Sequence, residues 1–194
     1  MKEIWELIEA KLTELSPKAA AGLQPGATAE AIAHLEHVIG TKLPQDFKAS
    51  CQVHNGQSPE SPGLIESEEL LSLPEIQVQW QIWKDLLDSK TFENEQGSYT
   101  SNPHPGIRND WWNPLWIPIT HDGSGDHYCL DLAPAATGNR GQIIRMWHDD
   151  PERSLEAPSF TAWMTDYKNK LESGQLVYSE NYFGIIDKDV DDED

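Results

Sequence analysis

The segment His121–His127, with the sequence HDGSGDH, gathers the side chains of this chain that are best placed to do chemistry. Its serine, Ser124, could serve as a nucleophile. An activated serine of the G-x-S-x-G type stands at a strand-to-helix elbow, whereas Asp122 and Asp126 flank this one and an apolar, strand-like run follows. Asp and Gly in this order are typical of a tight turn whose carboxylates accept backbone N–H groups. We therefore predict a structural turn.

The same segment fails the sequence tests for a metal site. A calcium loop would place oxygen ligands at alternate positions, as the Asp and Ser residues of the segment do. It would then need a glycine and a later glutamate, where this chain has His127 and Ala133. Zinc could use His121 and His127, but no third ligand stands at a diagnostic spacing. We expect no metal here.

A second group, His148-Asp149-Asp150, could supply a base with an orienting carboxylate, but no nucleophile is identifiable beside it. Asp150 before Pro151 is equally typical of a turn that ends a strand. No glycine-rich loop precedes a helix, so nucleotide binding has no support. A paired-carboxylate glycosidase stays open, although nothing singles out two of the many acidic residues. The sequence therefore predicts no catalytic residues and no cofactor.

Three apolar runs must position these groups: Leu115–Ile119, Tyr128–Leu132 and Ile143–Trp147. Turn signals rich in Gly, Asn and Asp separate them, so they predict a three-strand meander at the centre of a sheet. Helical spacing, caps and breakers predict helices over 4–15, 28–39, 44–56, 74–87 and 159–173.

The remaining segments carry weaker signals. Leu64-Ile65 predicts a brief strand, 91–109 a loop, and Leu176–Ile186 a last strand. Helices precede the strands and a long helix follows them, so we expect an α+β fold in a single domain over 1–186, with a mixed or antiparallel sheet flanked by helices. Residues 187–194, DKDVDDED, form an acidic segment that we expect to be a flexible tail.

The charge balance is the outlier of the composition: 33 acidic against 14 basic residues give a net charge of −19. Such a field repels nucleic-acid phosphates and anionic lipids and attracts basic proteins. We therefore expect no nucleic-acid or membrane partner. A solvated surface without any partner would also explain the charge.

Cysteine usage and the amino-terminal residues bear on the compartment. Cys51 and Cys129 are the only cysteines, and their apolar neighbours predict buried thiols rather than a disulfide. The first residues, MKEIWELIEAKL, lack the continuous apolar region of a signal peptide. No apolar run reaches the roughly 18 residues of a membrane span. These features favour a reducing cytoplasm.

Several motifs, in order, resemble those of the SUKH superfamily, most closely the branch named for the fungal regulator of cell-wall glucan synthesis. The motifs are Leu43-Pro44-x-x-Phe47, Asn55-Gly56, Trp112-Asn113-Pro114-x-Trp116-Ile117-Pro118, Asp122-Gly123-x-Gly125, Cys129-Leu130-Asp131-Leu132-x-Pro134, Gly141-Gln142-Ile143, Trp147-His148-Asp149-Asp150 and Ser159-Phe160 leading to Trp163. The resemblance implies a mixed sheet flanked by helices, no established enzymatic activity, and a packing role for Trp112, Trp116 and Trp147.

Within this superfamily, fungal members look like scaffolds in cell-wall and stress signalling, and many bacterial members resemble immunity proteins that bind and neutralise polymorphic toxins, often nucleases. We therefore expect a non-enzymatic protein-binding module, in the first place an immunity protein that covers a basic toxin domain. The alternative is a scaffold or regulator of cell-wall or envelope synthesis. A third hypothesis is a hydrolase or small-ligand protein that uses the His121–His127 turn.

The binding surface would combine aromatic anchors with a charged border. The oligomeric state stays open. The residues expected at this surface are Trp111, Trp112, Asp122, Ser124, Asp126, His148 and Asp149.

Overall fold

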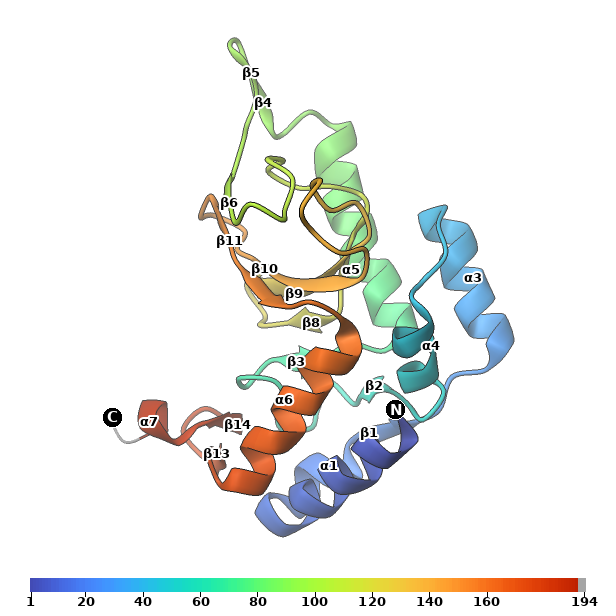
Figure 1. The fold of residues 1–194 in the computed structure, drawn as a ribbon, viewed down its shortest axis with the longest axis vertical. Helices are drawn as coiled ribbons and strands as arrows, with labels where there is room; N and C mark the ends of the chain where they lie inside the picture. The colour runs from blue at the N-terminus through green and yellow to red at the C-terminus, as the bar shows by residue number, and fades with distance from the viewer. Residues whose placement is uncertain (192–194) are drawn as a thin grey trace.

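The computed structural model describes residues 1–191 and contains helices and short strands in an α+β arrangement (Figure 1). The helices are α1 (Lys2–Leu15), α2 (Pro17–Ala21), α3 (Ala29–Ile39), α4 (Gln45–Cys51), α5 (Leu73–Asp88), α6 (Phe160–Ser173) and α7 (Lys188–Asp191). The strands are β1 (Leu23–Pro25), β2 (His54–Gln57), β3 (Glu69–Leu70), β4 (Glu93–Asn94), β5 (Gly97–Ser98), β6 (Asn102–Pro103), β7 (Trp116–Pro118), β8 (Thr120–His121), β9 (His127–Asp131), β10 (Gln142–Met146), β11 (Glu152–Arg153), β12 (Leu155–Ala157), β13 (Leu176–Ser179) and β14 (Gly184–Asp187).

The predicted meander is the central sheet. Its strand order is β12-β10-β9-β7, and all three pairings are antiparallel. Cys129 on β9 faces Ile144 on β10 and Pro118 on β7, so the three apolar runs are in register at the middle of the core. The α+β class and the antiparallel meander are confirmed. Trp147, predicted inside a strand, lies one residue beyond β10.

Local signals at the helix ends explain where the long helices begin and stop. The Thr28 and Ser159 side chains accept the backbone N–H groups of Ala31 and Ala162, which caps the first turns of α3 and α6. Gly40 and Gly174 end the same helices in the left-handed conformation, with φ of 71° and 73°. These four positions agree with the sequence prediction.

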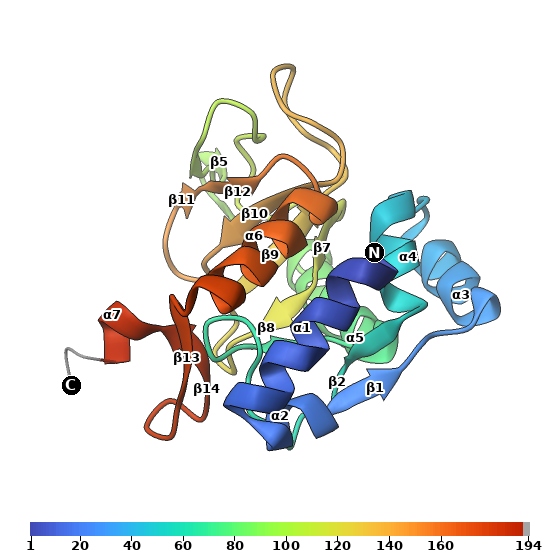
Figure 2. The ribbon, with the colours of Figure 1, turned by 60° about the horizontal axis from the view of Figure 1, so that its bottom comes forward.

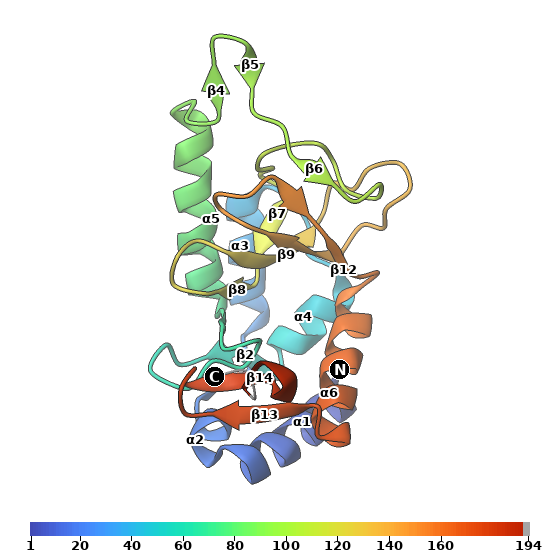
Figure 3. The ribbon, with the colours of Figure 1, turned by 90° about the vertical axis from the view of Figure 1, so that its left-hand side faces the viewer.

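Helices α5 and α6 cover opposite faces of the central sheet (Figure 3). The alternation along β9 sends His127 towards Trp83 of α5 and Tyr128 towards Trp163 of α6, with ring centroids 6.3 and 5.5 Å apart. Tyr128 lies opposite Arg145 of β10 in the register, so these two side chains share the α6 face.

Asn55-Gly56 departs from the prediction, because it lies inside β2 and does not end the preceding helix, which stops at Cys51. Strand β2 pairs with β1, a contact across some 30 residues that local propensity cannot signal. Gly56 has φ of 70°, and a Cβ there would lie 2.4 Å from the backbone nitrogen of Ser72. The Asn55 side chain accepts the backbone N–H of Leu73. The pair therefore allows the chain to approach the start of α5.

Three other segments also differ from expectation. Leu64 and Ile65 form no strand, although Ile65 makes an isolated bridge with Glu68 and the neighbouring Gly63 makes one with Gly184. Residues 176–186 fold back as the β13–β14 hairpin beside α6 (Figure 2). The predicted loop 91–109 contains the projecting β4–β5 hairpin and β6.

The acidic segment that was expected to be a flexible tail contains regular structure in its first residues. Asp187 closes β14 and α7 follows it, while residues 192–194 of the expected tail lie outside the described part of the chain. Within the described residues, no helix combines the length and apolar character needed to cross a membrane.

A candidate binding face around Trp147

The turn between β8 and β9 is organised by the Asp122 carboxylate. Its Oδ1 accepts backbone N–H groups from Ser124, Gly125 and Asp126 at 2.9, 3.0 and 2.8 Å. The Ser124 hydroxyl donates to the other oxygen, Oδ2. Gly123 and Gly125 adopt positive φ, which glycine tolerates best. The predicted structural turn is confirmed, and its serine hydroxyl is bound to a carboxylate.

These hydrogen bonds set the ionisation of Asp122. Partial burial would raise the pKa of this carboxyl, but the Ser124 hydroxyl and the three backbone N–H groups lower the pKa to about 2. Asp122 is therefore ionised at neutral pH.

Replacing Asp122 by alanine removes the shared acceptor of three N–H groups. We expect the free energy of unfolding at neutral pH to fall by about 1–2 kcal/mol, a range typical of lost capping acceptors. Urea denaturation would measure the loss. The Asp122→Asn variant keeps an amide oxygen as acceptor and should lose clearly less. An equal loss in both variants would mean that charge, not acceptor geometry, holds the turn.

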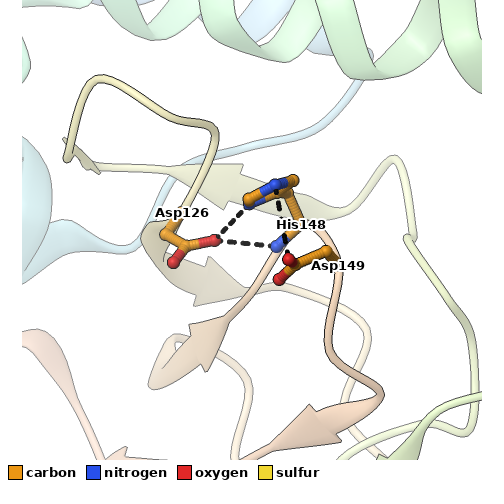
Figure 4. A group of neighbouring side chains, drawn as sticks. All are labelled: Asp126, His148 and Asp149. Carbon is orange, nitrogen blue, oxygen red and sulfur yellow. Dashed lines mark hydrogen bonds and ion pairs between the residues drawn. The ribbon is translucent and has the colours of Figure 1, made fainter.

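The end of this turn meets the segment that leaves β10 (Figure 4). Asp126 Oδ1 accepts the backbone N–H of His148 at 2.8 Å and lies 2.9 Å from its Nδ1. Asp149 Oδ2 lies 3.8 Å from His148 Nε2. The Asp126 hydrogen bond raises the pKa of His148, opposed by slight burial and aided by the Asp149 charge. Three of the predicted binding residues are thus brought together.

The possible ligand atoms of Asp126, His148 and Asp149 lie close enough together to share a cation. Among residues 1–191, this is the group of His and carboxylate side chains that meets this criterion. Two of them are exposed, and the His148 ring nitrogen nearest Asp126 is already hydrogen-bonded to it. The arrangement is that of an oriented ion pair. His121 and His127 stack at 5.4 Å, but both nitrogens of His127 have protein partners.

A shallow depression of about 310 Å³ lies beside this group, lined by Trp147, Asp149, Asp150 and Glu152. We call it the Trp147 depression. Trp147 is half-buried, and the three acidic residues are exposed. Among the described residues, Asp150 and Glu152 have no ion-pair partner, and Asp149 has only His148. Uncompensated carboxylates around an aromatic ring are complementary to a cationic side chain.

The two predicted tryptophans lie elsewhere. Trp112 is buried and stacks on Trp83, with ring centroids 6.1 Å apart, so it packs the core as the resemblance implied. Trp111 is partly buried under the Arg153 guanidinium, 5.4 Å from its ring centroid. The aromatic side chain at the acidic face is Trp147 instead. Its position at the end of an apolar run, followed by His148 and two aspartates, was the signal available in the sequence.

A buried ion pair between Arg145 and Glu68 lies next to the Trp147 ring. Arg145 Nη1 donates to Glu68 Oε1 at 2.5 Å, and the Thr120 hydroxyl donates to Glu68 Oε2 at 2.6 Å. Burial would lower the pKa of Arg145, but the Glu68 charge raises it. The guanidinium lies 4.6 Å from the Tyr128 ring centroid and 5.5 Å from that of Trp147. Arg145 thus bridges two aromatic rings on one sheet face.

The two cysteine thiols are poorly placed to act as nucleophiles. Burial raises the pKa of Cys51 to about 12 and raises the pKa of Cys129 as well, so both thiols stay protonated. Both are buried and free, as predicted. The carboxylates and the indole ring of the Trp147 depression, in contrast, are suited to binding a cationic group.

Comparison with known proteins matches the sequence of this chain to a family. The SMI1 / KNR4 family (SUKH-1) matches residues 26–166, which include the meander, the Asp122 turn, the Trp147 depression and the first half of α6. This match covers well over half of the chain.

Named relatives align along most of the chain. The glucan synthesis regulatory protein of Neurospora crassa is 26% identical over 209 residues, covering 91% of this chain and 39% of that protein. The cell wall assembly regulator SMI1 of Saccharomyces cerevisiae is 24% identical over 217 residues, covering 95% and 42%. F-box only protein 3 of Homo sapiens is 27% identical over 198 residues, covering 96% and 38%.

The chain spans less than half the length of each of these relatives, so it is similar to one part of them. Two are named as regulators, and none of the three is named as an enzyme. The chain belongs to the SMI1 / KNR4 family (SUKH-1).

Proposed function

We propose that this chain is a non-enzymatic regulatory module that binds a basic segment of a partner protein at the Trp147 depression. The names of its relatives, which regulate glucan synthesis and cell-wall assembly, support a regulatory or scaffolding role and favour it over toxin neutralisation. The buried, unpaired thiols suit a reducing compartment such as the cytoplasm.

The observation that carries the proposal is the charge pattern of the Trp147 depression. Asp149, Asp150 and Glu152 surround one half-buried indole, and His148 is the only described basic side chain that pairs with them. Lysine or arginine from a partner would gain both the carboxylate charges and the aromatic face. Nucleic-acid phosphates and anionic lipids would be repelled by the same face and by the net charge of −19.

A second candidate rests on the same charge. An acidic surface also covers the basic, nucleic-acid-binding face of a nuclease toxin, as an immunity protein would. The two functions differ in the number and strength of partners. An immunity protein binds one basic toxin tightly, whereas a regulator binds several host proteins more weakly.

The test is affinity capture from the native host with tagged protein at low and at high salt. We expect several basic host proteins at low salt and their loss at high salt, because exposed charges are screened. The triple variant Asp149→Asn, Asp150→Asn, Glu152→Gln should lose most of this capture. A matched control, Glu3→Gln, Glu60→Gln, Glu95→Gln, changes the charge equally at other exposed sites and should keep it.

Two outcomes would redirect the proposal. Capture of a single basic toxin domain would favour the immunity function. Equal capture by the triple variant and its matched control would show that overall charge, and not the Trp147 depression, attracts the partners.

A further inference from the structure

A second pocket, of about 90 Å³, lies on the same sheet face, between α6, β9 and the turn that precedes β3. Its walls are aromatic and its border is acidic. It is lined chiefly by Tyr128, Trp163, Tyr167, Glu66, Glu156 and Asp166. We call it the Glu66 pocket.

The charges of the Glu66 pocket are only partly balanced. Lys170 also lines the pocket, but its Nζ lies 2.9 Å from Asp166 Oδ2 and forms an ion pair there. Glu66 accepts the Tyr128 hydroxyl at 2.6 Å, and Glu156 accepts the Ser154 hydroxyl at 2.5 Å. Neither glutamate forms an ion pair with a basic side chain of residues 1–191. Three carboxylates therefore line the aromatic pocket against one ammonium group, that of Lys170, which is paired with Asp166 and also interacts with the charge of Glu66.

The molecule itself shows which cation suits such a wall. The Arg145 guanidinium lies over Tyr128, between aromatic rings, and its charge is met by Glu68. On the pocket side, the Trp163 ring lies 5.5 Å from Tyr128 at a tilt of 46°. Planar guanidinium groups stack on aromatic faces and bind carboxylates with two donors, which an ammonium group does less well.

Glu66 is held in place by an unusual backbone. Residues Ile65 and Glu68 exchange two backbone hydrogen bonds around a two-residue turn, in which Glu66 and Ser67 have φ of 50° and 62°. Such turns favour Asn-Gly, because both central residues need positive φ. Gly63 and Gly184 leave room for Ser67, which also donates its backbone N–H to Ile185. The surrounding structure thus fixes a glutamate where asparagine would be less strained.

We propose that the Glu66 pocket receives one arginine side chain of the partner, stacked against Trp163 and paired with Glu66 and Glu156. This inference rests on the proposed function, since it supplies a second anchor for the same basic segment. Tyr128, Arg145 and Trp147 follow one another along the sheet face that joins the pocket to the Trp147 depression. A partner segment with two basic side chains could therefore occupy both sites.

The test titrates the full chain with Nα-acetyl-arginine amide and follows the tryptophan indole N–H signals by NMR. We expect a saturable shift of the Trp163 signal, assigned with Trp163→Phe, and little shift of the buried Trp5 and Trp116. The matched control is Nα-acetyl-citrulline amide, which keeps the shape and lacks the charge. The Glu66→Asn variant should bind arginine amide about tenfold more weakly, with a melting temperature no lower than wild type. The Glu156→Gln variant should also bind more weakly.

Contrary results are equally clear. Equal shifts with citrulline amide, or full affinity in both the Glu66→Asn and Glu156→Gln variants, would overturn the pocket assignment. If the Trp147 depression captures a partner while arginine amide leaves Trp163 unchanged, the pocket fails and the proposed function stands. If arginine amide binds at Trp163 and no partner is captured, the pocket stands and the proposed function fails.

Discussion

Replacing Arg145 by alanine is expected to lower the free energy of unfolding by about 3–5 kcal/mol at about pH 8. This is the usual loss of stability when one partner of a buried ion pair is removed, about 3–5 kcal/mol. The variant leaves the Glu68 carboxylate, only 4% exposed, with the Thr120 hydroxyl as its remaining partner. It also removes the guanidinium that lies between the Tyr128 and Trp147 rings. Chemical denaturation of both proteins at the same pH would measure the loss.

A double-mutant cycle separates the ion pair from the lost packing. Arg145→Met keeps much of the apolar side chain, and Glu68→Gln removes the charge that would be stranded. The double variant should therefore be more stable than Arg145→Met alone. If Arg145→Ala costs less than about 1 kcal/mol, the pair is effectively solvent-exposed, in the range of surface ion pairs. The positions of the Tyr128 and Trp147 rings would then not depend on the Arg145–Glu68 ion pair.

This ion pair also explains why the site is hard to deduce from sequence. Glu68 and Arg145 are 77 residues apart, and neither belongs to a recognisable motif. Alternation along β10 does predict that Arg145 and Trp147 share a face. Helix α6 covers this face at Tyr128 but leaves Trp147 partly exposed, and periodicity along β10 does not show how far that cover extends. That limit follows from tertiary packing, so the sequence places Trp147 at the end of an apolar run but does not show that it is only half-buried.

The parts of the fold with strong local signals were predictable. The Ser159 cap and the Asp122 turn satisfy their hydrogen bonds within a few residues, and the strands of the meander pair with the apolar runs next to them in the sequence. Segments whose partners are distant were not. Asn55-Gly56 pairs with β1, and the 176–186 region turns back because β14 pairs with β13 and bonds Gly63. An apolar run cannot show by itself that it contains two strands.

The seven predicted binding residues also divide into those positioned by local structure and those positioned by distant parts of the chain. The turn and the residues after β10 come together because both lie at one end of a hairpin that periodicity predicts. Trp111 and Trp112 precede β7, and their neighbours come from α5 and from the region around Arg153. Nothing in the local sequence indicates these neighbours.

Lowering the pH from about 6.5 to 4 should remove about 3 kcal/mol of stability through His127 alone, from the difference between its pKa in the unfolded and folded chain. His127 is fully buried, with Nδ1 2.6 Å from the Thr120 carbonyl oxygen, and Trp83 Nε1 donates to its Nε2 at 3.1 Å. The ring is therefore neutral, and burial lowers its pKa to about 4, only partly opposed by the Thr120 carbonyl. Below pH 6.5 the unfolded chain binds a proton that the folded chain excludes, so stability falls until pH 4 and then levels.

The measurement is the free energy of unfolding of wild type minus that of His127→Gln, taken across this pH range. The subtraction is needed because Glu68 acts in the opposite direction: burial, against the pull of Arg145, raises its pKa to about 7. Its contribution is fully present below about pH 4.5 and is lost as the pH rises towards 7. Glu68 is unchanged in the variant, so its contribution cancels. A difference that does not change with pH would mean that His127 titrates as in the unfolded chain. The Trp83–His127–Thr120 chain of hydrogen bonds would then not hold the ring neutral on the α5 face of the sheet.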